Sequence, residues 1–90
     1  MPSIRVTIAN RLGLHARPAT AFAQTAGGFS ASVKVRRADG QEWVDGKSIM
    51  QMLMLAATAG TVLEIATEGG DAADAANALR ALVERQFDED

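Results

Sequence analysis

Ninety residues, 48% of them hydrophobic, predict one small domain spanning residues 1–90 around a single core, to which Phe22, Phe29 and Phe87 are expected to contribute. The absence of cysteine excludes disulfides and thiolate metal sites, and a single histidine is too few for a histidine-rich metal site. The net charge is −2, but residues 1–50 carry seven Lys and Arg against three Asp and Glu, whereas residues 51–90 carry two against eight. A basic first half favours an anionic ligand or partner, although such an asymmetry can also serve solubility alone.

The first half of the chain predicts a strand, a helix and a hairpin. Residues 3–9 alternate apolar and polar side chains, which is typical of a half-buried strand. Residues 16–26 are rich in helix formers and are followed by two glycines, a signal for a helix C-terminus. Residues 30–37 alternate again, and Asp39 followed by Gly40 predicts a hairpin turn that leads to a returning strand over residues 41–44, with Trp43 on one face.

The second half predicts a helix, a strand and a final helix. Ser48 followed by Gln51 predicts a capping box. In this motif the serine hydroxyl accepts the backbone N–H of the glutamine, and the glutamine side chain reaches back to the backbone N–H of the serine. The helix that follows is expected to end at Gly60, residues 61–68 read as a strand, and Asp71 opens a last helix that reaches Phe87. The order βαββαβα with a hairpin predicts an α+β fold: one antiparallel sheet with helices over one face.

His15, the only histidine, lies just before the helix expected to begin at Ala16. There the backbone N–H groups of Ala16 and Arg17 have no acceptor within the helix, and the positive end of the helix dipole favours an anion. The guanidinium of Arg17 suits phosphate oxygens, Pro18 stiffens the first turn, and imidazole is a nucleophile near neutral pH. A phosphorylated histidine would use all of these features, but the residues alone favour a plain role for His15, as a surface residue, a hydrogen-bonded core residue or a simple N-cap.

The segments GLHARPA at 13–19 and GKSIM at 46–50 resemble the HPr family, the histidine-containing phosphocarriers of the bacterial phosphoenolpyruvate-dependent phosphotransferase system. Chain length and element order match as well. The resemblance implies an open-faced β-sandwich with four antiparallel strands and three helices on one side. It also implies a carrier that takes a phosphoryl group from phosphorylated enzyme I on His15 Nδ1 and passes it to an enzyme IIA domain, without small-molecule turnover of its own.

The resemblance assigns roles to further residues. Arg17 matches the arginine that assists the phosphate, and Ser48 matches the serine that HPr kinase/phosphorylase modifies in many bacteria. An apolar docking patch beside Ser48 corresponds to Ile49, Met50 and Leu53. Ser48 nevertheless has a sufficient explanation as a helix cap, and among the neighbouring methionines Met52 or Met54 is expected in the core.

Two alternative functions stay open. Leu12 before the histidine motif, the long RRADGQEW hairpin and the acidic FDED end look more like nitrogen-type carriers, so the chain could mainly be a regulatory interaction module controlled through Ser48. An RNA-binding domain is disfavoured, because the strands offer only Trp43 for stacking and the isoelectric point is near 5.3. We expect a cytoplasmic monomer without cofactor, metal or nucleic-acid partner. Membrane insertion is not expected either, because no apolar run approaches the ~20 residues of a membrane span.

Overall fold

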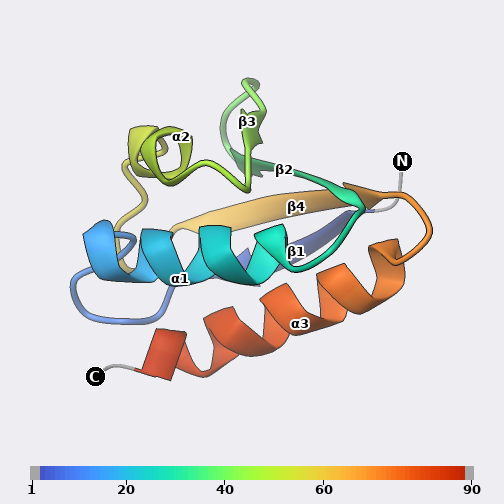
Figure 1. Ribbon diagram of the computed structural model, residues 1–90. Helices are drawn as coiled ribbons and strands as arrows, with labels where there is room; N and C mark the ends of the chain where they lie inside the picture. Colours follow the sequence, from blue (N-terminus) through green and yellow to red (C-terminus); the bar gives the residue numbers. More distant parts are fainter. Residues whose placement is uncertain (1–2, 89–90) are drawn as a thin grey trace.

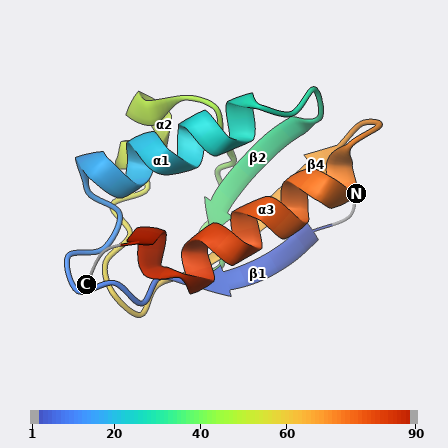
Figure 2. The same cartoon turned by 60° about the horizontal axis from the view of Figure 1, so that its bottom comes forward.

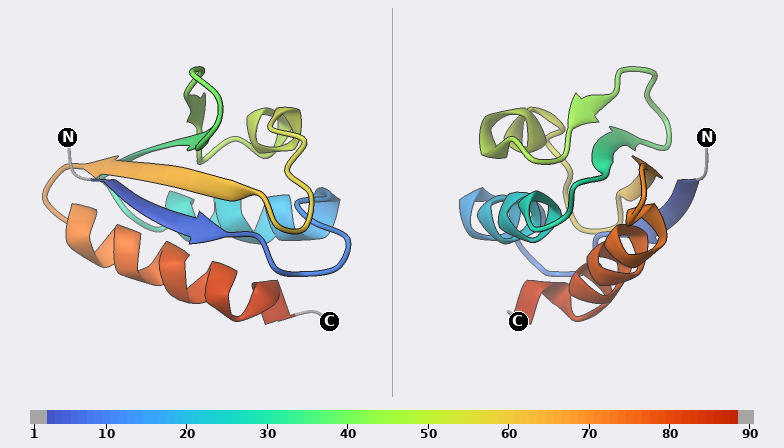
Figure 3. Two further views of the ribbon diagram at one scale, coloured as in Figure 1. Left: turned by 180° about the vertical axis from the view of Figure 1, so that it is seen from behind. Right: turned by 45° about the vertical axis from the view of Figure 1, so that its right-hand side comes forward.

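Four strands form one antiparallel sheet in the computed structural model, which describes residues 3–88. The strands lie in the order β1-β4-β2-β3, and three helices pack on one side of them (Figures 1 and 3). The elements are β1 (Ser3–Thr7), α1 (Ala16–Gly27), β2 (Ser32–Arg37), β3 (Val44–Asp45), α2 (Ile49–Met54), β4 (Val62–Glu68), α3 (Ala72–Glu84) and the short 3-10 helix η1 (Gln86–Asp88). The predicted α+β order βαββαβα is confirmed.

The alternation predicted for the strands builds the core beneath α1 and α3. Successive side chains of a strand point to opposite faces, so registered pairs such as Val6 with Leu63, and Val35 with Ile65, all face the helices. The helices supply the other side of this core, in which the largest fully buried side chains include Phe22, Met52, Leu79 and Val83. None of the helices in residues 3–88 has the length and apolar character that a membrane crossing needs.

Two predicted core aromatic residues lie differently from expectation. Phe29, predicted in the core, is only half-buried after the end of α1. Phe87 is buried as expected, but not on a continuous helix: α3 ends at Glu84, and Phe87 follows in η1 with a φ of 58°. The last residues of the acidic tail, 89 and 90, lie outside the described residues.

The helix predicted to run to Gly60 is wrong beyond Met54. Leu55 caps α2, and Ala56 takes a left-handed φ of 51° that no helix interior contains. The chain leaves the helix because the carbonyl of Ala57 accepts the backbone N–H of Leu14 at 2.8 Å, which ties this segment to the loop before α1. Of the two methionines considered for the core, Met52 is fully buried, whereas Met54 is 76% exposed.

The predicted hairpin exists, but its second strand is shorter than expected. The Gly40 N–H donates to the Arg37 carbonyl at 2.9 Å, which confirms the turn, but β3 contains only Val44 and Asp45. Trp43 therefore lies outside the strand. Its ring packs against Arg36 of β2, with the guanidinium carbon 4.5 Å from the ring centroid, a cation–π contact that explains the residue structurally.

Asp71 joins the start of α3 to the start of β2. Its carboxylate makes no cap bond to its own helix and instead accepts the N–H groups of Ser30 at 3.0 Å and Ala31 at 2.8 Å. The Ser30 N–H, followed by that of Ala31, holds the pKa of Asp71 below its ordinary value. The ionised carboxylate is therefore the form that the fold favours.

We expect Asp71→Asn to lower the midpoint of thermal unfolding at neutral pH by several degrees. A depressed pKa gives stability that is complete above the ordinary pKa of about 3.9 and is lost as pH falls through the lower folded value. The difference in melting temperature between parent and variant should therefore shrink below about pH 4. Thermal melts of both proteins from pH 7 to pH 2 check this, and a difference independent of pH would contradict it.

Candidate functional site

His15 is the N-cap of α1, as the sequence predicts. Its backbone is extended (φ −84°, ψ −168°), the helix begins at Ala16, and the Ala19 N–H donates to the His15 carbonyl at 3.0 Å. The imidazole makes no cap hydrogen bond and is half-buried. Ala16 and Arg17 are exposed in the first turn, where N–H groups have no acceptor within the helix. His15 and Arg17 therefore both lie at the N-terminal, positive end of α1.

The loop before His15 is fixed by close backbone contacts. Gly13 has a φ of +71°, and a Cβ atom there would lie 2.6 Å from the Ala57 carbonyl oxygen, so only glycine fits. The buried Asn10 donates from Nδ2 to the Gly13 carbonyl at 2.7 Å, and the Leu14 N–H donates to Ala57. Sequence reasoning did not identify Asn10 or Ala57. An asparagine three residues before a glycine is a turn signal that points to Asn10, but nothing local points to Ala57.

Arg17 lies on the outer surface of the first turn of α1. It lines a shallow hollow of about 480 Å³ together with residues of the first turns of the same helix, namely Ala16, Thr20, Ala21 and Gln24. The Thr20 hydroxyl donates to the Ala16 carbonyl at 2.8 Å. An anion bound at His15 would meet cationic and N–H donors from one turn of helix.

Ser48 caps α2, but only half of the predicted capping box forms. The Ser48 hydroxyl accepts the Gln51 N–H at 3.2 Å, as predicted. The reciprocal bond is absent: Gln51 Oε1 accepts the N–H of Asp45 at 2.8 Å, and the Ser48 N–H donates to the Asp45 carbonyl at 3.1 Å. Because the chain turns tightly between β3 and α2, the glutamine amide reaches the end of β3 instead of the N-cap.

The proposed docking patch is divided between the surface and the core. Ile49 is 39% exposed and Met50 74%, whereas Leu53 is half-buried and packs against the hydrophobic core. Two further large apolar side chains are exposed that the sequence did not assign to this surface, Met54 and Leu12, the latter at 66%. Helix α2 packs beside α1 near its first turns, so the patch and His15 belong to the same end of the molecule (Figures 1 and 2).

Comparison with known proteins places this geometry in a family. The model for the PTS HPr component phosphorylation site matches residues 2–85, a span that includes His15. The phosphocarrier protein HPr of Pseudomonas aeruginosa is 48% identical over 89 residues, covering 99% of this chain and 98% of that protein. The phosphocarrier protein NPr of Proteus mirabilis is 41% identical over 86 residues, covering 96% and 94%. The crystal structure of HPr from Thermoanaerobacter tengcongensis superposes with a TM-score of 0.92 at 39% identity, covering 100% of this chain and 99% of that one.

A small α+β domain with a histidine at a helix N-terminus is the architecture of a phosphoryl carrier. The chain belongs to the HPr family, the phosphocarrier proteins of the phosphotransferase system. Its similarity to an NPr is lower than to the HPr of Pseudomonas, and the resemblance noted from the histidine and serine motifs is confirmed.

Proposed function

We propose that His15 accepts a phosphoryl group from phosphorylated enzyme I and passes it to an enzyme IIA domain. The observation that carries this assignment is the position of the only histidine in the chain. It is the N-cap of α1, its imidazole makes no cap hydrogen bond, and Arg17 and the first-turn N–H groups follow it at the start of the same helix. Family membership implies enzyme I and enzyme IIA as partners.

The chemistry is a direct exchange of one phosphorus bond for another. A lone pair on His15 Nδ1 attacks phosphorus while the bond from phosphorus to the donor group breaks, and the reverse exchange delivers the group to the acceptor. The guanidinium of Arg17 and the N–H groups of Ala16 and Arg17 stabilise the negative charge of the phosphoryl oxygens throughout the exchange. The loop bonds of Gly13 and Leu14 hold the backbone of His15 in place during the exchange.

The partner would dock on the apolar surface of α2. Ile49 and Met50 are the exposed members of this surface, and Leu53 supports them from below. Ser48 at the start of the same helix is the proposed regulatory site, where HPr kinase/phosphorylase would add a phosphate. A phosphate there would be stabilised by the helix N-terminus and would place about two negative charges beside the docking surface.

A second candidate is a regulatory module of a nitrogen-type phosphotransferase system, controlled through Ser48. The similarity to NPr and the exposed Leu12 favour it. The two candidates differ in whether the chain mainly passes the phosphoryl group of His15 on to an acceptor or mainly acts through the state of Ser48.

Mass spectrometry of the intact protein tests the proposal. Incubation with phosphoenolpyruvate and enzyme I should add one phosphoryl group, and subsequent addition of enzyme IIA should remove it. A chain that stays unmodified under conditions in which a known HPr is fully phosphorylated would refute the carrier function. A chain that is modified but cannot transfer the group would favour the regulatory candidate.

We expect Arg17→Ala to slow phosphoryl transfer to His15 at least tenfold, a loss of about 1.4 kcal/mol of transition-state stabilisation. Arg17 is exposed and does not belong to the core, so circular dichroism and thermal melting should stay close to those of the parent. Arg80→Ala is the matched control, because it removes the same charge from an exposed position on α3. Equal rates for the two variants would remove Arg17 from the site.

A further inference from the structure

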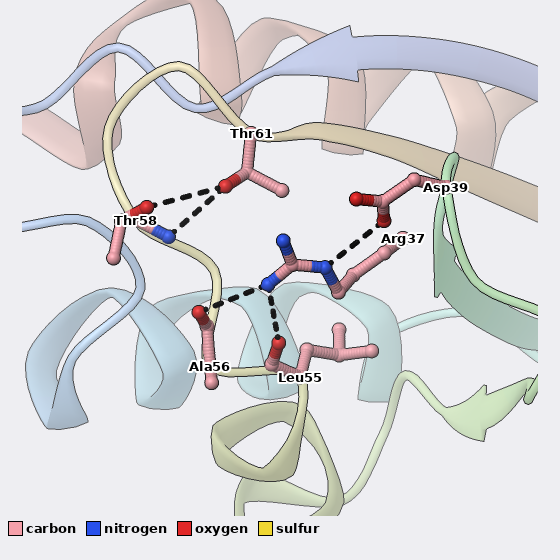
Figure 4. Close-up of polar contacts among 6 residues, drawn as sticks. All are labelled: Arg37, Asp39, Leu55, Ala56, Thr58 and Thr61. Carbon is pink, nitrogen blue, oxygen red and sulfur yellow. Dashed lines mark hydrogen bonds and ion pairs between the residues drawn. The ribbon is translucent and has the colours of Figure 1, made fainter.

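The guanidinium of Arg37 links the end of β2 to the β2–β3 turn and to the end of α2. Arg37 is the last residue of β2, and its Nη1 donates to the carbonyls of both Leu55 and Ala56 at 3.2 Å. Its Nε donates to Asp39 of the hairpin turn at 3.1 Å (Figure 4). One side chain therefore binds the β2–β3 turn and the end of α2 at the same time.

Arg37 binds the carbonyl of Leu55, the C-cap of α2, and the carbonyl of Ala56, the residue after the cap. Helix ends leave such carbonyls without intrahelical donors, and a cation is favourable there. Ala56 also has a left-handed backbone, a conformation that a residue with a Cβ keeps only when its surroundings hold it. Arg37 binds the carbonyls of Leu55 and Ala56, on either side of the Ala56 N–Cα bond, and is therefore placed to hold this conformation.

The segment held by Arg37 is also the one that supports the backbone of His15. The next residue, Ala57, accepts the Leu14 N–H at 2.8 Å, and Gly13 lies against the same carbonyl. Leu14, Leu55 and Ala57 are all buried, so this contact has little room to shift. A continuous line of bonds thus runs from Arg37 through residues 55–57 to the residue before His15.

We propose that Arg37 is a positioning residue for phosphoryl transfer, which fixes the start of α1 relative to the docking helix α2. The assignment rests on the proposed role of His15. A partner bound on α2 must present its phosphoryl group at the imidazole, and a displacement of about 1 Å between the two can cost about a hundredfold in rate. The effect should fall on kcat, because the docking surface itself remains.

Three variants test the proposal. Arg37→Met removes the bonds, and Arg37→Lys keeps the charge with a single ammonium in place of the fork. Arg36→Met is the matched control: it removes the same charge from the neighbouring residue of β2, whose side chain binds Glu64 and Trp43 on the other face. For each protein the rate of His15 phosphorylation is measured against carrier concentration with enzyme I, and hydrogen exchange of the Leu14 amide is followed by NMR.

We expect Arg37→Met to lower kcat about tenfold or more and to speed Leu14 exchange by a similar factor, with Arg37→Lys in between and Arg36→Met near the parent. Slower transfer with unchanged Leu14 exchange would overturn the proposal, since Arg37 would then contact the partner directly. An equal loss of transfer rate in Arg36→Met and Arg37→Met would also overturn the proposal, because the loss would then come from the removed charge and not from the bonds of Arg37. If Arg37→Met does not fold, Arg37→Lys carries the same comparison. A parent that is never phosphorylated refutes the proposed function instead, and Leu14 exchange then still decides whether Arg37 holds the loop.

Discussion

His15→Ala should take up no phosphoryl group from phosphoenolpyruvate and enzyme I, whereas the parent takes up one. The variant keeps α1, because the imidazole makes no cap hydrogen bond whose loss would weaken the helix. The loop bonds run from the side chain of Asn10 and from the backbone N–H groups of Gly13 and Leu14 to backbone carbonyls, and they do not involve the ring. Intact-protein mass spectrometry checks the uptake, and circular dichroism checks that the fold is retained.

The chemical stability of the adduct separates His15 from every hydroxyl acceptor. A phosphoramidate on imidazole is labile in acid and stable in base, whereas a phosphate ester on Ser48 is stable in acid. Ser48→Ala is the matched control and should be labelled as the parent is. Labelling of His15→Ala at the parent's rate, or an acid-stable adduct on the parent, would contradict the assignment.

The parts of the fold that repeat a local pattern were predictable from the sequence. The strand alternation, the start of α1 at Ala16 and the turn at Gly40 depend on neighbouring residues only, and all three are confirmed. The end of α2 was not predictable in this way. Residues 55–59 are compatible with a helix in propensity, but Arg37 and Leu14 bind the carbonyls at residues 55–57 from distant segments.

The candidate site shows the same division. His15, Ala16 and Arg17 are adjacent in sequence, so a motif and the physics of a helix N-terminus were enough to bring them together. The contacts that hold this loop could not be predicted, because Ala57 and Arg37 are distant from it in sequence and belong to no motif that marks them. The expectation that Met52 or Met54 lies in the core is met by Met52, whereas Met54 is exposed on the same side of α2 as Met50.

Ser48→Asp should slow phosphorylation of His15 by enzyme I roughly tenfold to a hundredfold at low salt, about 1.4 to 2.8 kcal/mol of lost association. The first half of this chain is basic, so a complementary partner surface would be acidic, and encounter would be electrostatically steered. A carboxylate at Ser48 would lie next to the exposed Ile49 and Met50, where the partner is proposed to bind. The effect should appear mainly as a higher KM and should shrink as salt screens the charge.

Ser48→Asn is the matched control for charge. Asparagine, aspartate and serine are similarly good N-caps, so both variants should keep the bond to the Gln51 N–H and melt close to the parent. Ser48→Ala, in contrast, should lose about 1 kcal/mol of cap stability while docking normally. The measurement is the rate of His15 phosphorylation against enzyme I concentration at two salt levels for the four proteins. Asn and Asp differ at this position only in charge, so an equal loss of phosphorylation rate in both variants would come from altered packing. If Ser48→Asp is phosphorylated at the parent's rate at low salt, Ser48 is only a helix cap.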